Sequence, residues 1–305
     1  MGELENKFIV PPFSVLDTRQ GYWQKRKREW INIGIKSEVG RDATCLPDSF
    51  VPEKYGHAIM EGRSIFDPLL CELMYKWFAP KNGKILDPFA GGSVRGVVAD
   101  KLGYDYLGIE LSAKQVEANK QQAKDLEVNP EWRQGDSNKL LDDVENESAD
   151  LVFSCPPYFN LEEYSDHPDD ISNKTYDEFL NLYESIIKKA IDKLKPNRFA
   201  IFVVGEVRDK DGFYIGFVSD TVRAFQNSGV RLYNDVILVN VAGTMPLRVG
   251  NMFPNNRKIS KGHQNVLIFY KGEVSKIREE LGILDLSKED IGSKGNQSTL
   301  MDLYT

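Results

Sequence analysis

Apolar residues alternate along much of the chain between strand-like runs and helix-like spacings. Residues 68–78 carry apolar side chains at every third or fourth position, and Asp67 precedes Pro68 where an N-cap would stand. Further helices are expected at residues 20–35, 92–102, 113–126, 175–194 and 217–228, and strands at residues 84–87, 104–111, 149–155 and 199–207. Because strands alternate with helices, the pattern predicts a parallel sheet with helices on both faces.

The last part of this pattern differs from the rest. Residues 230–241 and 264–270 have strand character, but no helix-sized periodic run lies between them, which predicts an antiparallel pair joined by a long loop. Another short strand is expected to end at Gly135, which brings the number of strands to seven. The sequence therefore predicts an α/β fold with a mostly parallel seven-stranded sheet and an antiparallel final strand.

Composition sets the limits of the expected domain, which we place at residues 61–272. Residues 1–60 form an N-terminal extension that begins with a loose polar lead-in up to Pro12, and residues 273–305 form a weakly ordered tail rich in Ser, Lys and Gly. Within the domain, an acidic loop at residues 160–173 and a basic insertion at residues 242–263 are long enough to be functional.

The net charge of −7 argues against a protein that coats nucleic acid by overall attraction, so the positions of the basic residues matter more than their total. One basic cluster, residues 25–28, lies between two tryptophans, and the basic insertion contains no Asp or Glu. A solvated surface explains either cluster alone as well as phosphate binding does. The candidate nucleic-acid contacts are Lys25, Arg26, Lys27, Arg28, Arg248, Arg257, Lys258 and Lys261.

Several classes of protein are excluded by composition. A chain of 305 residues with 41% hydrophobic residues buries a sizeable core. It has no run of about 18 apolar residues and does not start like a signal peptide, so we expect a cytoplasmic protein without membrane contact. Cys45, Cys71 and Cys155 lack the spacing of metal ligands, so we expect reduced thiols and no metal.

Three expected strand ends carry residues suited to a nucleoside-containing cofactor. The first is followed by a Gly-rich turn at residues 87–93, and ligands of open α/β sheets bind beyond the carboxyl ends of the strands. Glu110 ends the second strand and suits a ribose diol, and Asp136 follows the third and suits the amine of adenine. The turn lacks GxGxxG, but a nicotinamide dehydrogenase uses a similar strand, turn and helix, so the turn by itself does not identify the cofactor.

The fourth strand ends in Ser154-Cys155-Pro156-Pro157-Tyr158. The two prolines have no N–H to donate, which leaves the backbone carbonyls free to accept from an amino group, and the tyrosine ring can stack on a flat base. In the alternative, structural interpretation the prolines only end a strand.

Residues 87–93 and 154–158 resemble the cofactor and catalytic motifs of the DNA amino-methyltransferases, which modify N6 of adenine or N4 of cytosine. Residues 263–271 look like the His-containing final strand of that family, and residues 11–41 and 155–165 look like DNA methylases common in phage and prophage genomes. The resemblance covers most of residues 11–272. It implies a Rossmann-like class I methyltransferase fold, S-adenosylmethionine as cofactor, and double-stranded DNA from which the target base is flipped.

The same resemblance implies roles for individual residues. Residues 62–67 would be an upstream motif that packs over the methionine end of the cofactor. The implied cofactor-binding residues are Arg63, Ser64, Phe66, Asp87, Pro88, Phe89, Ala90, Gly91, Gly92, Ser93, Glu110, Leu111, Asp136 and Ser137. The catalytic candidates are Ser154, Cys155, Pro156, Pro157, Tyr158 and Glu206.

Cys155 departs from the family, which usually has Asp, Asn or Ser before Pro-Pro to accept a hydrogen bond from the target amine. A neutral thiol accepts weakly, so the Pro156 carbonyl or Ser154 would carry more of that role. Alternatively, Cys155 is the nucleophile of a cytosine-C5 methyltransferase, with Glu206 as its acid, although the Pro-Cys-Gln sequence of those enzymes is absent. RNA methylation and a non-catalytic binding module on the same fold also stay open, as do a restriction partner and a homodimer.

Overall fold

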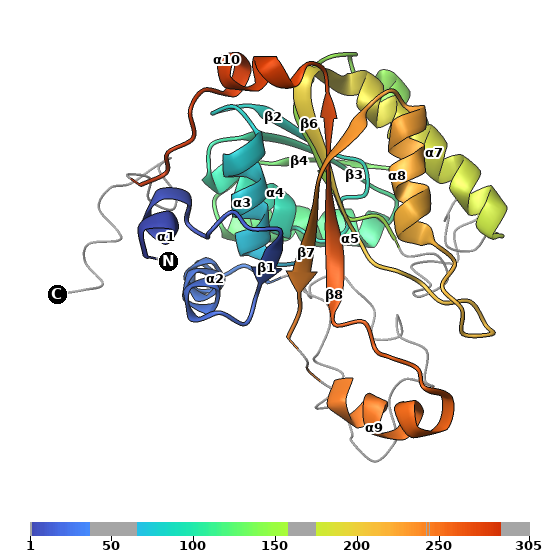
Figure 1. The fold of residues 1–305 in the computed structure, drawn as a ribbon. Coiled ribbons are helices and arrows are strands. Elements are labelled where there is room, and N and C mark those ends of the chain that lie inside the picture. The colour runs from blue at the N-terminus through green and yellow to red at the C-terminus, as the bar shows by residue number, and fades with distance from the viewer. Residues whose placement is uncertain (1, 37–65, 158–174, 242, 244, 288–305) are drawn as a thin grey trace.

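The computed structural model describes residues 2–36, 66–157, 175–241, 243 and 245–287 (Figure 1). Its centre is an eight-stranded sheet with the order β1-β7-β8-β6-β5-β2-β3-β4. The strands are β1 (Val15–Asp17), β2 (Lys84–Asp87), β3 (Asp105–Glu110), β4 (Glu131–Gln134), β5 (Ala149–Ser154), β6 (Leu194–Val204), β7 (Arg231–Val239) and β8 (His263–Lys271). Among these strands β8 alone runs antiparallel to its neighbours, β6 and β7, as the sequence predicts.

Helices cover both faces of the sheet, which confirms the predicted α/β class. They are α1 (Gly2–Phe8), α2 (Gly21–Asn32), α3 (Pro68–Phe78), α4 (Val94–Lys101), α5 (Ala113–Asp125), α6 (Ser137–Leu140), α7 (Tyr176–Lys193), α8 (Phe217–Asn227), α9 (Met245–Asn256) and α10 (Ile277–Leu281). No helix among the described residues is both long and apolar enough to cross a lipid bilayer.

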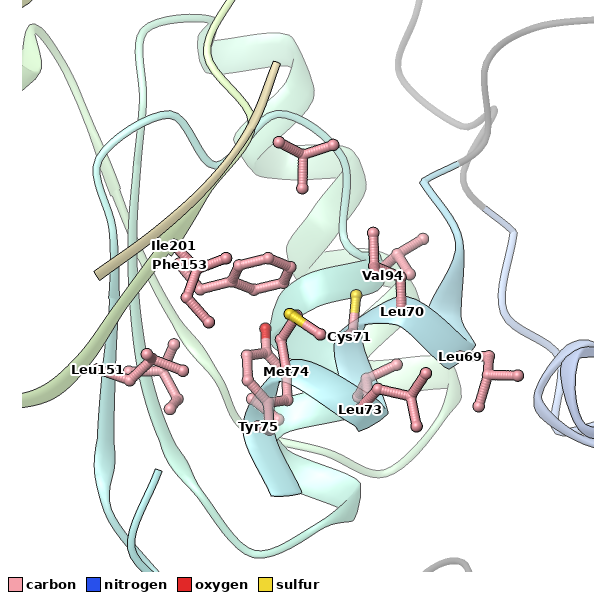
Figure 2. Packing of buried hydrophobic residues seen from close by; sticks show 14 of the residues in the cluster. Leu69, Leu70, Cys71, Leu73, Met74, Tyr75, Val94, Leu151, Phe153 and Ile201 are labelled. Carbon is pink, nitrogen blue, oxygen red and sulfur yellow. The ribbon is translucent and has the colours of Figure 1, made fainter. Parts of the chain in front are cut away.

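Alternate residues of the central strands face two separate cores, because side chains along a strand point to opposite faces. In β5, Leu151 and Phe153 pack with α2, α3 and α4, whereas Val152 packs with α7 and α8. Figure 2 shows the first core, where α3 places Met74 and Tyr75 near Leu151 and Phe153.

Local capping fixes where the predicted helices begin. The Asp67 carboxylate accepts a hydrogen bond from the backbone N–H of Leu69 (3.0 Å), and Pro68 takes the first helical position of α3. Thr175 and Glu178 form a reciprocal capping box at the start of α7. These starts agree with the expected ones, but β6 begins at Leu194, five residues before the expected start.

The N-terminal residues are part of the same folded unit, which corrects the expectation of a loose polar lead-in. Residues 2–8 form α1, and the Trp77 indole donates to the Phe8 carbonyl (3.1 Å). Trp23 and Trp30 of α2 are fully buried in the core that contains α3. Strand β1 adds an eighth strand in parallel register with β7, so the expected seven strands were one too few. A strand of three residues is too short to show an alternating pattern.

The basic insertion contains a helix, α9, where a loop without a helix was expected. The apolar residues Met245, Val249, Met252 and Phe253 do recur at helical spacing, but Gly250 and Pro254 interrupt them. Proline inside a helix removes a backbone hydrogen bond, so sequence reasoning rejects a helix at this point. The acidic loop at residues 160–173 lies outside the described residues. The boundaries at residues 61 and 272 stay predictions.

Candidate functional site

The Gly-rich turn after β2 is built around a buried carboxylate, Asp87. Its oxygens accept hydrogen bonds from Arg95 Nε (2.5 Å), Tyr106 Oη (2.7 Å) and Ser154 Oγ (2.5 Å), and the side chain has no solvent exposure. Burial opposes the charge of Arg95, but the Asp87 carboxylate outweighs this effect and raises the pKa of Arg95. Asp87 was expected to bind the cofactor, but its carboxylate instead accepts hydrogen bonds that hold the turn together.

Arg95 of α4 joins the two sides of this turn. Its Nη2 donates to the carbonyls of Phe89 (2.6 Å) and Ala90 (2.8 Å), and its guanidinium lies 4.6 Å from the centre of the Phe66 ring. Arginine suits this position because its guanidinium presents several N–H donors in a fixed plane. Sequence reasoning missed Arg95, although it stands eight residues after Asp87 in a helix that otherwise buries apolar side chains.

The second strand end comes close to the same turn. Glu110 accepts hydrogen bonds from the backbone N–H of Gly91 through Oε2 and of Ser112 through Oε1, both at 2.8 Å, and stays partly exposed. The turn fits tightly, because a Cβ placed on Gly108 would lie 2.8 Å from that of Ala90. Gly91 has φ 51°, a left-handed conformation that favours glycine. Leu111 follows directly and is partly buried.

The third strand end is tied to the first two. Asp136 caps α6 by accepting from the backbone N–H of Asn138 (2.9 Å) and is partly exposed. Ser137 is buried and donates to the carbonyl of Pro88, and the backbone N–H of Gly135 donates to the Glu110 carbonyl (2.9 Å). The structure thus brings the three predicted strand ends together, and Glu110 and Asp136 are both partly exposed there.

The Pro-Pro motif begins at the end of β5, next to β2. Ser154 is fully buried, and its hydroxyl donates to Asp87 and accepts from the Phe89 N–H (3.2 Å). This hydroxyl is engaged inside the protein, which corrects the suggestion that it assists a target amine. Cys155 is partly buried and not in a disulfide, Pro156 is buried and Pro157 partly exposed. Tyr158, Arg63 and Ser64 lie outside the described residues.

Glu206 lies two residues beyond the end of β6, the strand next to β5. Its Oε1 accepts from the backbone N–H of Val218 in α8 (2.9 Å). Its Oε2 is buried and has no hydrogen-bond partner among the described residues. In the same part of the chain, no group of three or more His, Cys, Asp and Glu side chains is arranged to hold a metal ion.

The basic cluster of α2 has two different sides. Arg26 pairs with buried Glu72 (2.7 Å), and Lys27 pairs with Asp67 (3.0 Å), so both point toward α3. Lys25 and Arg28, three residues apart, are exposed. The expectation that all four contact phosphates is therefore corrected, because two of them stabilise the fold.

The basic residues near α9 also differ from one another. Arg257 is exposed and donates to the carbonyls of Phe253 (3.2 Å) and Pro254 (2.6 Å) at the end of the helix. Lys258 is partly exposed, whereas the ammonium of Lys261 donates to Oδ1 of Asn265 (3.1 Å). The side chain of Arg248 lies outside the described residues. Figure 1 shows α9 beyond the carboxyl end of β7.

Two family models match this chain. One described as a DNA methylase covers residues 149–300, and one described as a methyltransferase domain covers residues 89–169. The second match includes residues 89–93 of the Gly-rich turn and the Pro-Pro motif. Residues 149–300 are thus similar to the DNA methylase family, and the matches indicate S-adenosylmethionine as the cofactor.

Individual relatives are more distant. The type II beta methyltransferase M.BslI of Bacillus sp. (strain NEB-606) is 26% identical over 149 residues, which are 45% of this chain and 16% of that protein. The crystal structure of TrmN from Thermus thermophilus has a TM-score of 0.45 at 14% identity, covering 68% of this chain and 50% of TrmN. That of the [4+2]-cyclase SpnF has a TM-score of 0.48 at 14% identity, covering 69% and 84%.

Proposed function

We propose that this protein transfers a methyl group from S-adenosylmethionine to the exocyclic amino group of adenine (N6) or cytosine (N4) in DNA. The observation that carries the proposal is the contact between Ser154, in front of the Pro-Pro motif, and Asp87, at the start of the Gly-rich turn. This contact joins the expected catalytic motif to the expected cofactor turn across two neighbouring strands. Such an arrangement suits a reaction that needs the two reactants held close together.

The residues at the strand ends fit the proposed cofactor by their chemistry. The partly exposed carboxylate of Glu110 would accept hydrogen bonds from a ribose diol, and that of Asp136 from the amine of adenine. Arg63, Ser64, Phe66, Leu111 and Ser137 stay predicted cofactor contacts. When bound, S-adenosylmethionine supplies an electrophilic methyl group.

The Pro-Pro motif would receive the target base. The backbone carbonyl of Pro156 would accept a hydrogen bond from the amino group, and Tyr158 would stack on the ring. The base would have to leave the duplex, because an enzyme cannot align the in-plane amino group with the sulfonium methyl inside the base stack. A phage or prophage origin, a restriction partner, a homodimer and a cytoplasmic location stay predictions that rest on the sequence.

The product identifies the reaction. DNA incubated with the protein and methyl-labelled cofactor would be digested to nucleosides and measured by mass spectrometry, for the wild type and for Cys155→Ser. We expect N6-methyladenine or N4-methylcytosine, with activity retained in the serine variant, because amino methylation needs no nucleophile on the enzyme. If the product is 5-methylcytosine and the substitution abolishes it, Cys155 is the nucleophile and the proposal is wrong.

Exposed basic residues are proposed to bind the DNA backbone. Substituting Lys25, Arg28, Arg257 and Lys258 with glutamine should weaken DNA binding and lower the slope of log Kd against log salt by about 1 for each phosphate that is no longer neutralised. Lys120→Gln together with Lys124→Gln, two exposed residues of α5, is the matched control and should leave the slope unchanged. Fluorescence anisotropy at several salt concentrations measures it, and an unchanged slope in the four-residue variant contradicts the assignment.

A further inference from the structure

The Glu206 carboxylate has one oxygen that the protein does not satisfy. Oε1 is held at 2.9 Å by the backbone N–H of Val218 in the first turn of α8, which fixes the orientation of the group. Oε2 is buried without a hydrogen-bond partner among the described residues. Leaving a charged acceptor buried and unpaired is unfavourable, so an oxygen of this kind is expected to accept a hydrogen bond from a donor that binds there.

The nearby cation does not supply that donor. The Glu206 carboxylate lies close enough to Lys261 to act on its pKa, which burial lowers and the carboxylate raises. The ammonium nevertheless donates to Oδ1 of Asn265 (3.1 Å), whose amide donates in turn to Asp235 (3.1 Å). The hydrogen bond of the Lys261 ammonium therefore goes to Asn265, and Oε2 of Glu206 stays without a partner among the described residues.

Glu206 lies at the same edge of the sheet as the Pro-Pro motif. Strands β5 and β6 are parallel neighbours, and their register pairs Ser154 with Phe202. Cys155 to Pro157 continue directly from Ser154, and Glu206 comes four residues after Phe202, so both segments leave the sheet side by side.

Two tyrosines of α7 lie near these segments. The ring of Tyr183 lies 6.3 Å from that of Phe202 in β6, and burial raises the pKa of this tyrosine. The pKa of Tyr176 is raised by burial, by its hydrogen bond to Asp220 and also by the Glu206 carboxylate. Tyr176 is therefore near enough to Glu206 for that carboxylate to act on its pKa.

Other acceptors near the motif are engaged or weak. The hydroxyl of Ser154 already donates to Asp87 and accepts from Phe89, and a neutral thiol such as that of Cys155 accepts hydrogen bonds poorly. An exocyclic amine has two N–H groups, and the Pro156 carbonyl would satisfy one of them. The second N–H needs an acceptor, and the buried Oε2 of Glu206 needs a donor.

We propose that Oε2 of Glu206 accepts a hydrogen bond from the target amino group and receives its proton in the reaction. This role rests on the proposed amino-methyltransferase function. The carbon–nitrogen bond forms while the carbon–sulfur bond breaks, and the electron pair of the broken bond stays on sulfur, which becomes neutral. The nitrogen, now positively charged, releases one proton to the Glu206 carboxylate, so that a neutral methylated amine leaves.

The test compares Glu206→Gln with the wild type in single-turnover methylation of DNA. The amide keeps the size of the side chain and leaves its oxygen available to Val218, but it presents an N–H in place of Oε2. We expect the methylation rate to fall about 100-fold or more, the range found when general-base catalysis is removed. The Kd values for S-adenosylmethionine and DNA and the melting temperature should stay unchanged. Glu117→Gln, an exposed glutamate of α5, is the matched control and should keep the wild-type rate.

A second variant asks whether the missing acceptor explains the slower reaction. Cys155→Asp, added to Glu206→Gln, places a carboxylate on the neighbouring strand, and we expect it to restore the rate at least tenfold. A Glu206→Gln rate equal to that of the wild type would overturn the role of Glu206, and so would a slower rate that is explained by weaker cofactor binding. The wild-type product separates the two hypotheses. If it is 5-methylcytosine the proposed function fails, whereas an amino-methylated base with an unaffected Glu206→Gln variant refutes the Glu206 role alone.

Discussion

Arg95→Met is expected to lower the free energy of unfolding by about 3–5 kcal/mol, because it leaves the buried Asp87 carboxylate without its cation. The substitution also releases the carbonyls of Phe89 and Ala90, to which Nη2 donates. The Gly-rich turn should therefore lose its fixed shape, and S-adenosylmethionine should bind more weakly even at temperatures where the protein stays folded. Urea denaturation measures the first effect, and calorimetric titration of the cofactor measures the second.

An exposed arginine provides the matched control for this experiment. Arg133 pairs with Glu131 at 2.6 Å, but about a third of its side chain and half of that of Glu131 are exposed, so Arg133→Met should cost about 0–1 kcal/mol. Adding Asp87→Asn to Arg95→Met removes both charges and should recover part of the stability, since the penalty comes from the unpaired carboxylate. Equal small effects of Arg95→Met and Arg133→Met would show that the Asp87 network does not hold the turn.

Arg26→Met is expected to destabilise the fold by about 3 kcal/mol, which sets Arg26 apart from its neighbours in the basic cluster. Arg26 donates twice to Glu72, which is fully buried and also accepts from the Trp30 indole (2.7 Å). The expected effect is at the lower end of the range for broken buried pairs, because Lys76 still lies 3.3 Å from Glu72. Lys25→Met, one residue away and exposed, is the control and should cost little.

The destabilisation caused by Arg26→Met should depend on pH. Burial by itself raises the pKa of Glu72, but the hydrogen bond and charge of Arg26 lower it below its ordinary value of 4.5. A carboxylate with a lowered pKa contributes stability above its unfolded-state pKa and loses that contribution as the pH falls. The difference in unfolding free energy between wild type and variant should thus be largest near neutral pH and shrink below about pH 4.5. A difference that stays constant down to about pH 3 would contradict the ion-pair explanation.

The sequence predicts the central layers of the fold because these elements carry strong local signals. Asp67 and Pro68 define the start of α3, and β2 and β5 consist largely of buried apolar residues. The elements that were missed have weak or contradictory signals. Strand β1 has three residues and a partner far along the chain, and α9 includes Pro254. Tertiary contacts determine whether β1 and α9 form, and the local propensity of their residues does not reveal them.

The sequence predicts that the strand ends of the candidate site lie together, but it does not show which hydrogen bonds their side chains form. The motifs correctly indicate that residues 87–93, Glu110 and Asp136 come together at one edge of the sheet. They do not reveal that the Ser154 hydroxyl donates a hydrogen bond to Asp87 inside the protein, because a motif does not show which polar groups surround a carboxylate. The same limit applies to residues 25–28, where a run of like charges divides into ion pairs and exposed side chains.

The pairing of β1 with β7 also has a consequence for the order in which the protein folds. Thr18 donates to the carbonyl of Val239 (2.8 Å), a contact between residues 221 positions apart. During synthesis β1 leaves the ribosome early, yet its partner strand β7 is made long afterwards. Contacts of such large sequence separation form slowly, since a long loop must close before they stabilise anything. Until β7 is made, the N-terminal segment therefore keeps apolar side chains that are not fully buried. Chaperone binding or self-association can compete with the pairing of β1 and β7 at this stage.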